Sequence, residues 1–165
     1  MTILDIDMKQ HTNKSQQGFT LIELLVVIGI LAVLLAIVLV AINPARQFAL
    51  ANNTQRRSDV TAVLNSIDQY AADYRGVLPP GMPASGASLT VSSAAGQTGA
   101  AFCNALVPTY IAALPRDPSL GSYIDCNTYN TTYQVTVATA AAGNTPRVTV
   151  SAPNAELGAV ISVTR

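Results

Sequence analysis

The sequence predicts an α+β protein in which one long N-terminal helix packs on a small head with an antiparallel β-sheet. Three observations lead to this fold class: an apolar run near the N-terminus, an amphipathic helical pattern directly after it, and short alternating apolar segments near the C-terminus. With 165 residues, the chain has room for one domain and an accessory segment. Its nine basic and nine acidic residues balance, so the total charge suggests neither nucleic acid nor an anionic surface as a partner.

The apolar run extends from Leu24 to Ile42 and contains nineteen residues, none with a polar side chain. A helix of about 20 apolar residues, rising about 1.5 Å per residue, crosses a hydrocarbon core of about 30 Å. Helices buried in soluble domains rarely stay apolar on every face over this length. We therefore predict a membrane-spanning helix over residues 19–43, with Glu23 just inside its apolar part.

Residues 1–18 form a leader whose second half is polar throughout. A secretory signal peptide is cleaved after its apolar stretch, near small residues. Here the candidate processing point, Gly18, precedes the apolar run, so cleavage there keeps the run in the mature chain. A start at Met8 instead of Met1 removes both acidic residues of the leader, and the sequence leaves both starts open.

Residues 18–27 read Gly-Phe-Thr-Leu-Ile-Glu-Leu-Leu-Val-Val, which resembles the processing site of type IV prepilins and type II secretion pseudopilins. The resemblance is close from Gly18 to about Ile42, and loose over the rest of the chain. It implies a type IV pilin-like fold, cleavage by a prepilin peptidase between Gly18 and Phe19, and methylation of the new amino group of Phe19. It also implies assembly through Glu23, which in these families pairs with the N-terminal amine of a neighbouring subunit.

The position of Glu23 has a physical consequence of its own. A carboxylate near the membrane core costs roughly 2.5–3.5 kcal/mol on insertion scales, so an unpaired one should find a partner. One buried charge pair sets the register between helices better than apolar contacts alone. The alternative is a glutamate that reaches the headgroups from a shallow position.

Residues 44–76 show a helix with one apolar face, which we expect to lie against the head. The apolar positions recur at helical spacing: Val60, Val63, Leu64, Ile67, Tyr70, Ala71 and Tyr74. The charged positions are expected mostly on other faces: Arg56, Arg57, Asp59, Asp68 and Asp73. Gly76 is the expected C-terminal cap of this helix.

Pro44 interrupts the long helix, because it lacks an amide donor and disfavours helical angles at Asn43. We expect a kink there. In related filaments a stretch between glycine and proline positions can unwind, which makes Gly29 to Pro44 the corresponding segment here. A static kink at the membrane exit is the equal alternative.

Residues 77–165 make up the globular head. Residues 77–100 are rich in Pro, Gly, Ser and Ala and predict a surface loop, and residues 101–114 predict short helical turns broken at Pro108. Alternating apolar residues predict three short antiparallel strands, which would cover the apolar face of the helix. These strands are centred on Tyr133–Val137, Val148–Val150 and Ile161–Val163, with turns at Gly143-Asn144 and Pro153-Asn154.

The two cysteines, Cys103 and Cys126, both follow the apolar run. An even number of cysteines beyond a membrane segment predicts one disulfide in an oxidising compartment. Two buried free thiols in a cytosolic protein are the alternative. A disulfide over this loop would restrict the unfolded chain by roughly 3 kcal/mol in the chain-entropy model.

No cofactor or metal is expected, and the inventory of reactive side chains argues against an enzyme. The chain has one histidine, His11, which lies in the leader, and no Cys-His, Ser-His-Asp or metal-spaced cluster. A Leu-Pro-x-Asp-Pro stretch at residues 114–118 is similar to one in major pseudopilins, which often bind calcium farther along the chain. The acidic, glycine-rich loop of those proteins is not evident, so Asp117 and Asp125 are only weak calcium candidates.

The resulting hypothesis is a structural subunit of a type IV pilus-like filament. The alternatives are the major pseudopilin of a type II secretion system and, in another class, a monomeric bitopic membrane protein with an exported binding head. The expected partners are copies of the chain, a prepilin peptidase, the assembly platform and, before assembly, the lipid bilayer.

We expect a single-pass protein of the bacterial inner membrane, whose head lies outside the cytoplasm and later belongs to a periplasmic or cell-surface filament. The cysteine pair and the resemblance support this orientation, whereas the arginines after the span do not follow the positive-inside rule. Nucleic acid is not an expected partner, because the head offers Arg116, Arg147 and Arg165 but no lysine cluster.

Overall fold

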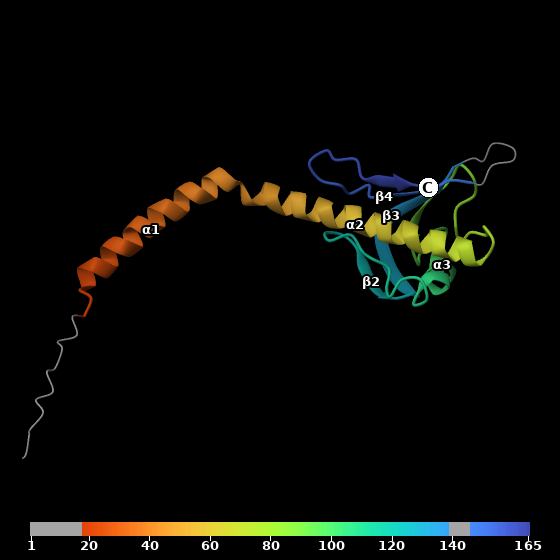
Figure 1. Ribbon diagram of the computed structural model, residues 1–165, viewed down its shortest axis with the longest axis horizontal. Helices are drawn as coiled ribbons and strands as arrows, with labels where there is room; N and C mark the ends of the chain where they lie inside the picture. Colours follow the sequence, from red (N-terminus) through yellow and green to blue (C-terminus); the bar gives the residue numbers. More distant parts are fainter. Residues whose placement is uncertain (1–17, 139–145) are drawn as a thin grey trace, which may run out of the picture. The chain divides into compact units, whose positions relative to one another are not determined.

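The computed structural model describes residues 18–138 and 146–165, and these fall into two units. The first unit ends at Asn43, and the second extends from Pro44 to Arg165. Figure 1 shows the first unit as a single helix and the second as a helix with a sheet. The leader up to residue 17, with His11 and both possible starts, and the predicted turn at Gly143-Asn144 lie outside the described residues.

Helix α1 extends from Leu21 to Ile42, and Thr20 caps its N-terminus. The backbone is helical through Gly29 without a break. The helix ends because Asn43 adopts a left-handed conformation, with φ 48° and ψ 80°. Asn43 is one of the residue types that tolerate this conformation, and Pro44, whose φ suits a first helical position, then begins the next helix.

Helix α2 extends from Pro44 to Asp73 and carries the predicted apolar stripe. The side chains of Val60, Val63, Leu64 and Ile67 are fully buried against the head. The helix ends in a left-handed turn, in which the backbone N–H of Gly76, with φ +89°, donates to the carbonyl oxygen of Ala71. Arg75, with φ 55°, is the first left-handed residue of this turn, and Gly76, the predicted cap, directly follows it.

The sheet of the head contains five antiparallel strands among the described residues, in the order β1-β3-β4-β5, with β2 also pairing with β3. The strands are β1 (Ser88–Ser92), β2 (Ser122–Asp125), β3 (Thr128–Val137), β4 (Val148–Ser151) and β5 (Ser162–Thr164). In the register of β3, Asn130 faces Ser92 of β1 and Ser122 of β2, so these two strands lie on opposite sides of it. The α+β fold class is therefore confirmed.

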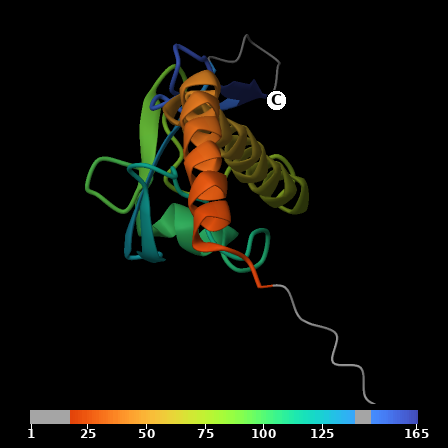
Figure 2. The same ribbon diagram turned by 90° about the vertical axis from the view of Figure 1, so that its left-hand side faces the viewer.

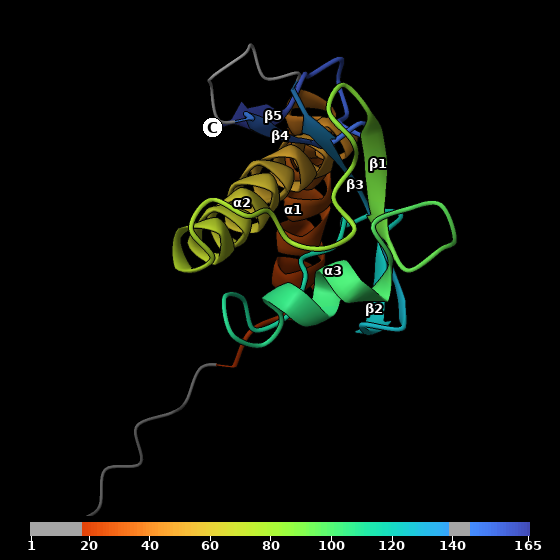
Figure 3. The same cartoon turned by 90° about the vertical axis from the view of Figure 1, so that its right-hand side faces the viewer.

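The core of the head lies between α2 and the sheet, which curves around one side of the helix (Figure 2, Figure 3). The sheet contributes alternate residues of its strands, including Tyr133, Val135 and Val150, all fully buried. Helix α3 (Gly99–Leu106) adds Phe102 and Leu106 to the same core. Alternation along β3 and β4 thus places one face on the helix, as the sequence predicted.

Two expectations about the head were wrong. The segment at residues 77–100 is not only a loop, because Ser88–Ser92 forms β1 and pairs with β3. The backbone N–H of Thr90 donates to the side chain of Gln97, and that of Ser92 to the hydroxyl of Thr98, so polar side chains cover part of this strand's outer edge. Strand β2 was not predicted at all, since its side chains are mostly exposed and show no clear alternation.

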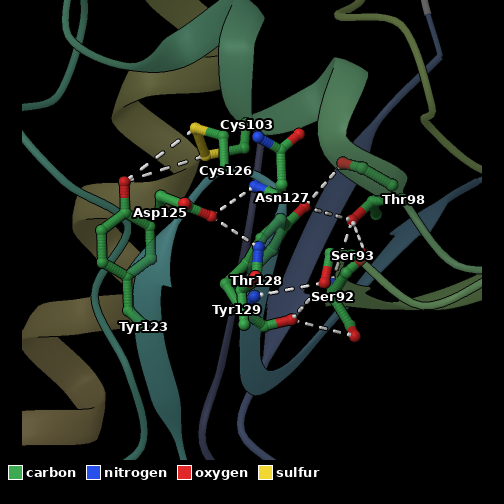
Figure 4. The surroundings of a disulfide bond; sticks show 11 residues. Ser92, Ser93, Thr98, Cys103, Tyr123, Asp125, Cys126, Asn127, Thr128 and Tyr129 are labelled. Carbon is green, nitrogen blue, oxygen red and sulfur yellow. Dashed lines mark hydrogen bonds between the residues drawn. A yellow bond between two sulfur atoms is a disulfide. The ribbon is translucent and has the colours of Figure 1, made fainter.

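A disulfide joins Cys103 of α3 to Cys126 in the turn between β2 and β3, across 23 residues of sequence. Figure 4 shows the hydroxyl of Tyr123 beside both sulfur atoms, at 4.0 Å from Cys103 and 3.9 Å from Cys126. The turn also uses Asp125, whose Oδ1 accepts the backbone N–H groups of Asn127 and Thr128. The disulfide therefore fixes the exposed β2–β3 hairpin to the core.

Candidate functional site

Helix α1 is apolar on every side, and none of its side chains is buried within the chain. Its 22 residues make it the one helix, among the described residues, that is long and apolar enough to cross a membrane. At about 1.5 Å per residue this length matches a hydrocarbon core of about 30 Å. A surface of this kind needs either lipid or other apolar helices around it.

The first turn of α1 carries the only ionisable side chain of that helix, Glu23. The backbone N–H and the hydroxyl of Thr20 both donate to Oε2 of Glu23 at 2.8 Å. In return, the backbone N–H of Glu23 donates to the hydroxyl oxygen of Thr20 at 3.3 Å. This reciprocal arrangement is a capping box, and it holds the carboxylate at the N-terminal end of the helix, where the helix dipole favours negative charge.

The predicted processing residues precede this turn. Phe19 is 88% exposed, and a side chain at Gly18 would meet no other atom, so the described part of the chain leaves both residues uncovered. The structure thus places Gly18, Phe19 and Glu23 within one short stretch at the start of α1. Cys103 and Cys126 belong to the head and are no part of this site.

Thr20 is the member of this site that the sequence analysis did not single out. A threonine followed three residues later by a glutamate, directly before an apolar run, is the spacing of a capping box. That signal was present in the sequence. It was missed because Glu23 was interpreted through its cost in the membrane and its expected pairing with a neighbouring chain.

Comparison with family models gives one match, the prokaryotic N-terminal methylation motif, at residues 13–39. This motif is the hallmark of the prepilins from which type IV pilins and pseudopilins are made. The chain carries the prepilin motif. Comparisons with curated proteins and with solved structures give no match. The prepilin motif covers the end of the leader and most of α1, whereas the head lies outside it.

The prepilin motif supports a protein of the type IV pilin or pseudopilin class, which is structural rather than catalytic. It implies processing by a prepilin peptidase and assembly by machinery of the pilus type. Together with α1, it fits a single-pass anchor in the inner membrane.

The head has a second polar site, which is buried. Arg56 is fully buried on α2, so its expected place on a polar face was wrong. Its Nε lies 2.7 Å from Oδ2 of Asp117, and its Nη2 lies 3.2 Å from Oδ1 of the same carboxylate. Nη2 also donates to the hydroxyl of Ser119 at 2.9 Å and to Oε1 of Glu156 at 3.3 Å.

The carboxylate of Asp117 therefore accepts hydrogen bonds from other groups of the protein. Burial alone raises its pKa, but the hydrogen bonds from Arg56, from the hydroxyl and backbone N–H of Ser119 and from the backbone N–H of Leu120 hold the pKa well below its usual range. Both oxygens of this carboxylate accept from protein donors, and two of these bonds form a two-point ion pair with the buried Arg56. Among the residues that the structure describes, no group of three or more His, Cys, Asp or Glu side chains could hold a metal ion.

Proposed function

We propose that the chain is a structural subunit of a type IV pilus-like filament, assembled through α1. The proposal rests above all on the coincidence of the methylation motif at residues 13–39 with an apolar helix whose one ionisable side chain is Glu23. Cleavage between Gly18 and Phe19 keeps this helix and adds an amino group four residues before the glutamate. The mature N-terminus then carries one positive and one negative group at the edge of an apolar rod.

In the proposed filament, Glu23 of one chain pairs with the methylated amine of Phe19 in its neighbour. The geometry of the capping box supports this role, since both bonds from Thr20 fall on Oε2 and neither uses Oε1. An amine from a second chain could therefore approach Oε1 without breaking the cap. A buried pair of this kind has one position of lowest energy along the helix axis, and it would fix the stagger between subunits.

The major pseudopilin of a type II secretion system is the second candidate, because the same motif serves both classes. We favour the pilus, since the sequence lacks the acidic, glycine-rich C-terminal loop typical of major pseudopilins. A monomeric bitopic protein with an exported binding head is the candidate from another class. We propose no catalytic activity, no cofactor and no nucleic-acid partner for any of them.

The chemical state of the N-terminus distinguishes an assembling subunit from a bitopic monomer. We expect mass spectrometry of protein extracted from native membranes to find a chain that begins at Phe19 and bears one methyl group. A prepilin peptidase knockout should retain the leader and serves as the control. A wild-type chain that still carries the leader would favour the bitopic monomer.

A further inference from the structure

Four large apolar side chains are exposed at the end of the head where α2 begins. Phe48 of α2 is 71% exposed, Leu120 is 66% exposed, Leu157 is 57% exposed and Val160 is 91% exposed. We call these four residues the proximal rim. Figure 1 shows that the loop before β2 and the loop between β4 and β5 both lie beside the N-terminal half of α2.

The proximal rim is held in place by the buried Arg56. The backbone N–H of Leu120 donates to Oδ1 of Asp117, the carboxylate that pairs with Arg56. Glu156, next to Leu157, accepts from the same Nη2 of Arg56 and from the side chain of Asn52. The guanidinium of Arg56 therefore fixes both the loop before β2 and the loop between β4 and β5, so the rim has a defined structure.

Covalent connection places this surface close to the membrane. Pro44 follows α1 after a single residue, and Phe48 lies four residues farther along α2. At about 1.5 Å per residue, Phe48 is at most about 6 Å beyond Pro44 along the helix, and Asn52 at most about 12 Å. Each interfacial layer of a bilayer is about 5–8 Å thick. A head anchored by α1 thus holds its rim within reach of the headgroups.

The charges near the rim suit an anionic surface. No acidic residue occurs from Pro44 to Ser58, and Asp117 and Glu156 are engaged with Arg56. Arg57 and Arg116, each adjacent in sequence to a member of that ion pair, are exposed. Exposed apolar side chains together with exposed arginines are the composition of segments that lie in the interface of anionic membranes.

We propose that the proximal rim docks the head of each unassembled chain on the anionic membrane surface from which it emerges. The occupant is lipid rather than a second copy, because the anchor brings every chain to lipid, whereas a second copy is present only after assembly begins. Docking would hold the head in one orientation before polymerisation. The inference rests on α1 as a membrane span and not on the filament itself.

Tryptophan fluorescence tests the docking directly, because the chain contains no tryptophan. The full chain with Val160→Trp is reconstituted at one copy per nanodisc, in phosphatidylcholine and phosphatidylglycerol whose acyl chains are brominated near the headgroup. Val77→Trp is the matched control, since Val77 is 61% exposed and follows the C-terminal end of α2. We expect bromine to roughly halve the emission of the Val160→Trp chain, and to leave the Val77→Trp chain nearly unchanged.

The other outcomes decide against the proposal. Equal emission of the two chains in brominated and plain lipid would overturn it. A second contradicting result is also possible. Bromine would not quench the Val160→Trp chain at one copy per disc, but its emission would shift to the blue when many copies share a liposome. A second copy would then be the occupant. Leu157→Trp provides a second probe of the same surface, should the first variant not fold. If the Val160→Trp chain is quenched as strongly in brominated phosphatidylcholine alone as in the mixture with phosphatidylglycerol, the arginines do not contribute to docking.

Discussion

Replacing Glu23 by alanine should leave processing intact and reduce the yield of filaments by at least about tenfold. Gly18 and Phe19 are unchanged in this variant, so the peptidase still finds its bond. Assembly fails because the amine of each new subunit is left without a partner in an apolar environment. Removing one member of a buried ion pair costs about 3–5 kcal/mol, and about 1.4 kcal/mol already weakens an equilibrium tenfold. The measurement is the amount of sedimentable filament relative to membrane-bound monomer.

Two further variants separate the charge of Glu23 from its part in the capping box. Glutamine can also serve as the third residue of a capping box, so Glu23→Gln keeps the cap and removes the charge. We expect this variant to assemble as poorly as Glu23→Ala, whereas Leu24→Ala, which alters the next residue of the same helix, should assemble nearly normally. Filaments from Glu23→Gln at the wild-type level would show that the cap matters and the charge does not.

Replacing Arg56 by methionine should destabilise the head by about 3–5 kcal/mol, because Asp117 would be left buried without its cation. For a domain of this size, such a loss lowers the melting temperature by roughly 10 °C or more. Near-ultraviolet circular dichroism of the full chain in detergent can follow the transition. All six tyrosines belong to the second unit, Pro44–Arg165, so α1 does not contribute to this signal.

Arg57→Met is the matched control, because Arg57 is the next residue of α2 and its side chain is exposed. Its melting temperature should change by no more than a few degrees, since replacing an exposed charge outside a buried ion pair changes the free energy of unfolding little. The double variant Arg56→Met with Asp117→Leu should recover part of the loss, because it removes both charges. If Arg56→Met melts like the wild type, the buried ion pair does not stabilise the head.

The apolar helix α1 and the apolar stripe of α2 were predictable because both depend on local sequence. Nineteen residues without a polar side chain indicate a helix able to cross a membrane, and the spacing of Val60, Val63, Leu64 and Ile67 specifies one buried helix face. The same local rule was wrong at Tyr74, which is 53% exposed. It stacks on Tyr70, with ring centroids 4.3 Å apart, at the end of α2.

The features that were missed depend on partners distant in sequence. Arg56 is buried because Asp117, 61 residues later, and Glu156, 100 residues later, meet its guanidinium. The periodicity of α2 does not predict these ion pairs. Strand β1 was missed for a similar reason, since it pairs with β3, in which Val135 lies opposite Leu89.

The proposed contact between Phe19 and Glu23 can be measured in intact filaments. Filaments assembled from a mixture of ¹⁴N- and ¹⁵N-labelled chains are treated with a carbodiimide, which joins an amine to a carboxylate only where the two are in contact. The account predicts a cross-link between the N-terminal amine of Phe19 and Glu23 that combines a light and a heavy peptide. Cross-links within one label alone, or an N-terminal amine joined to a different carboxylate, would contradict it.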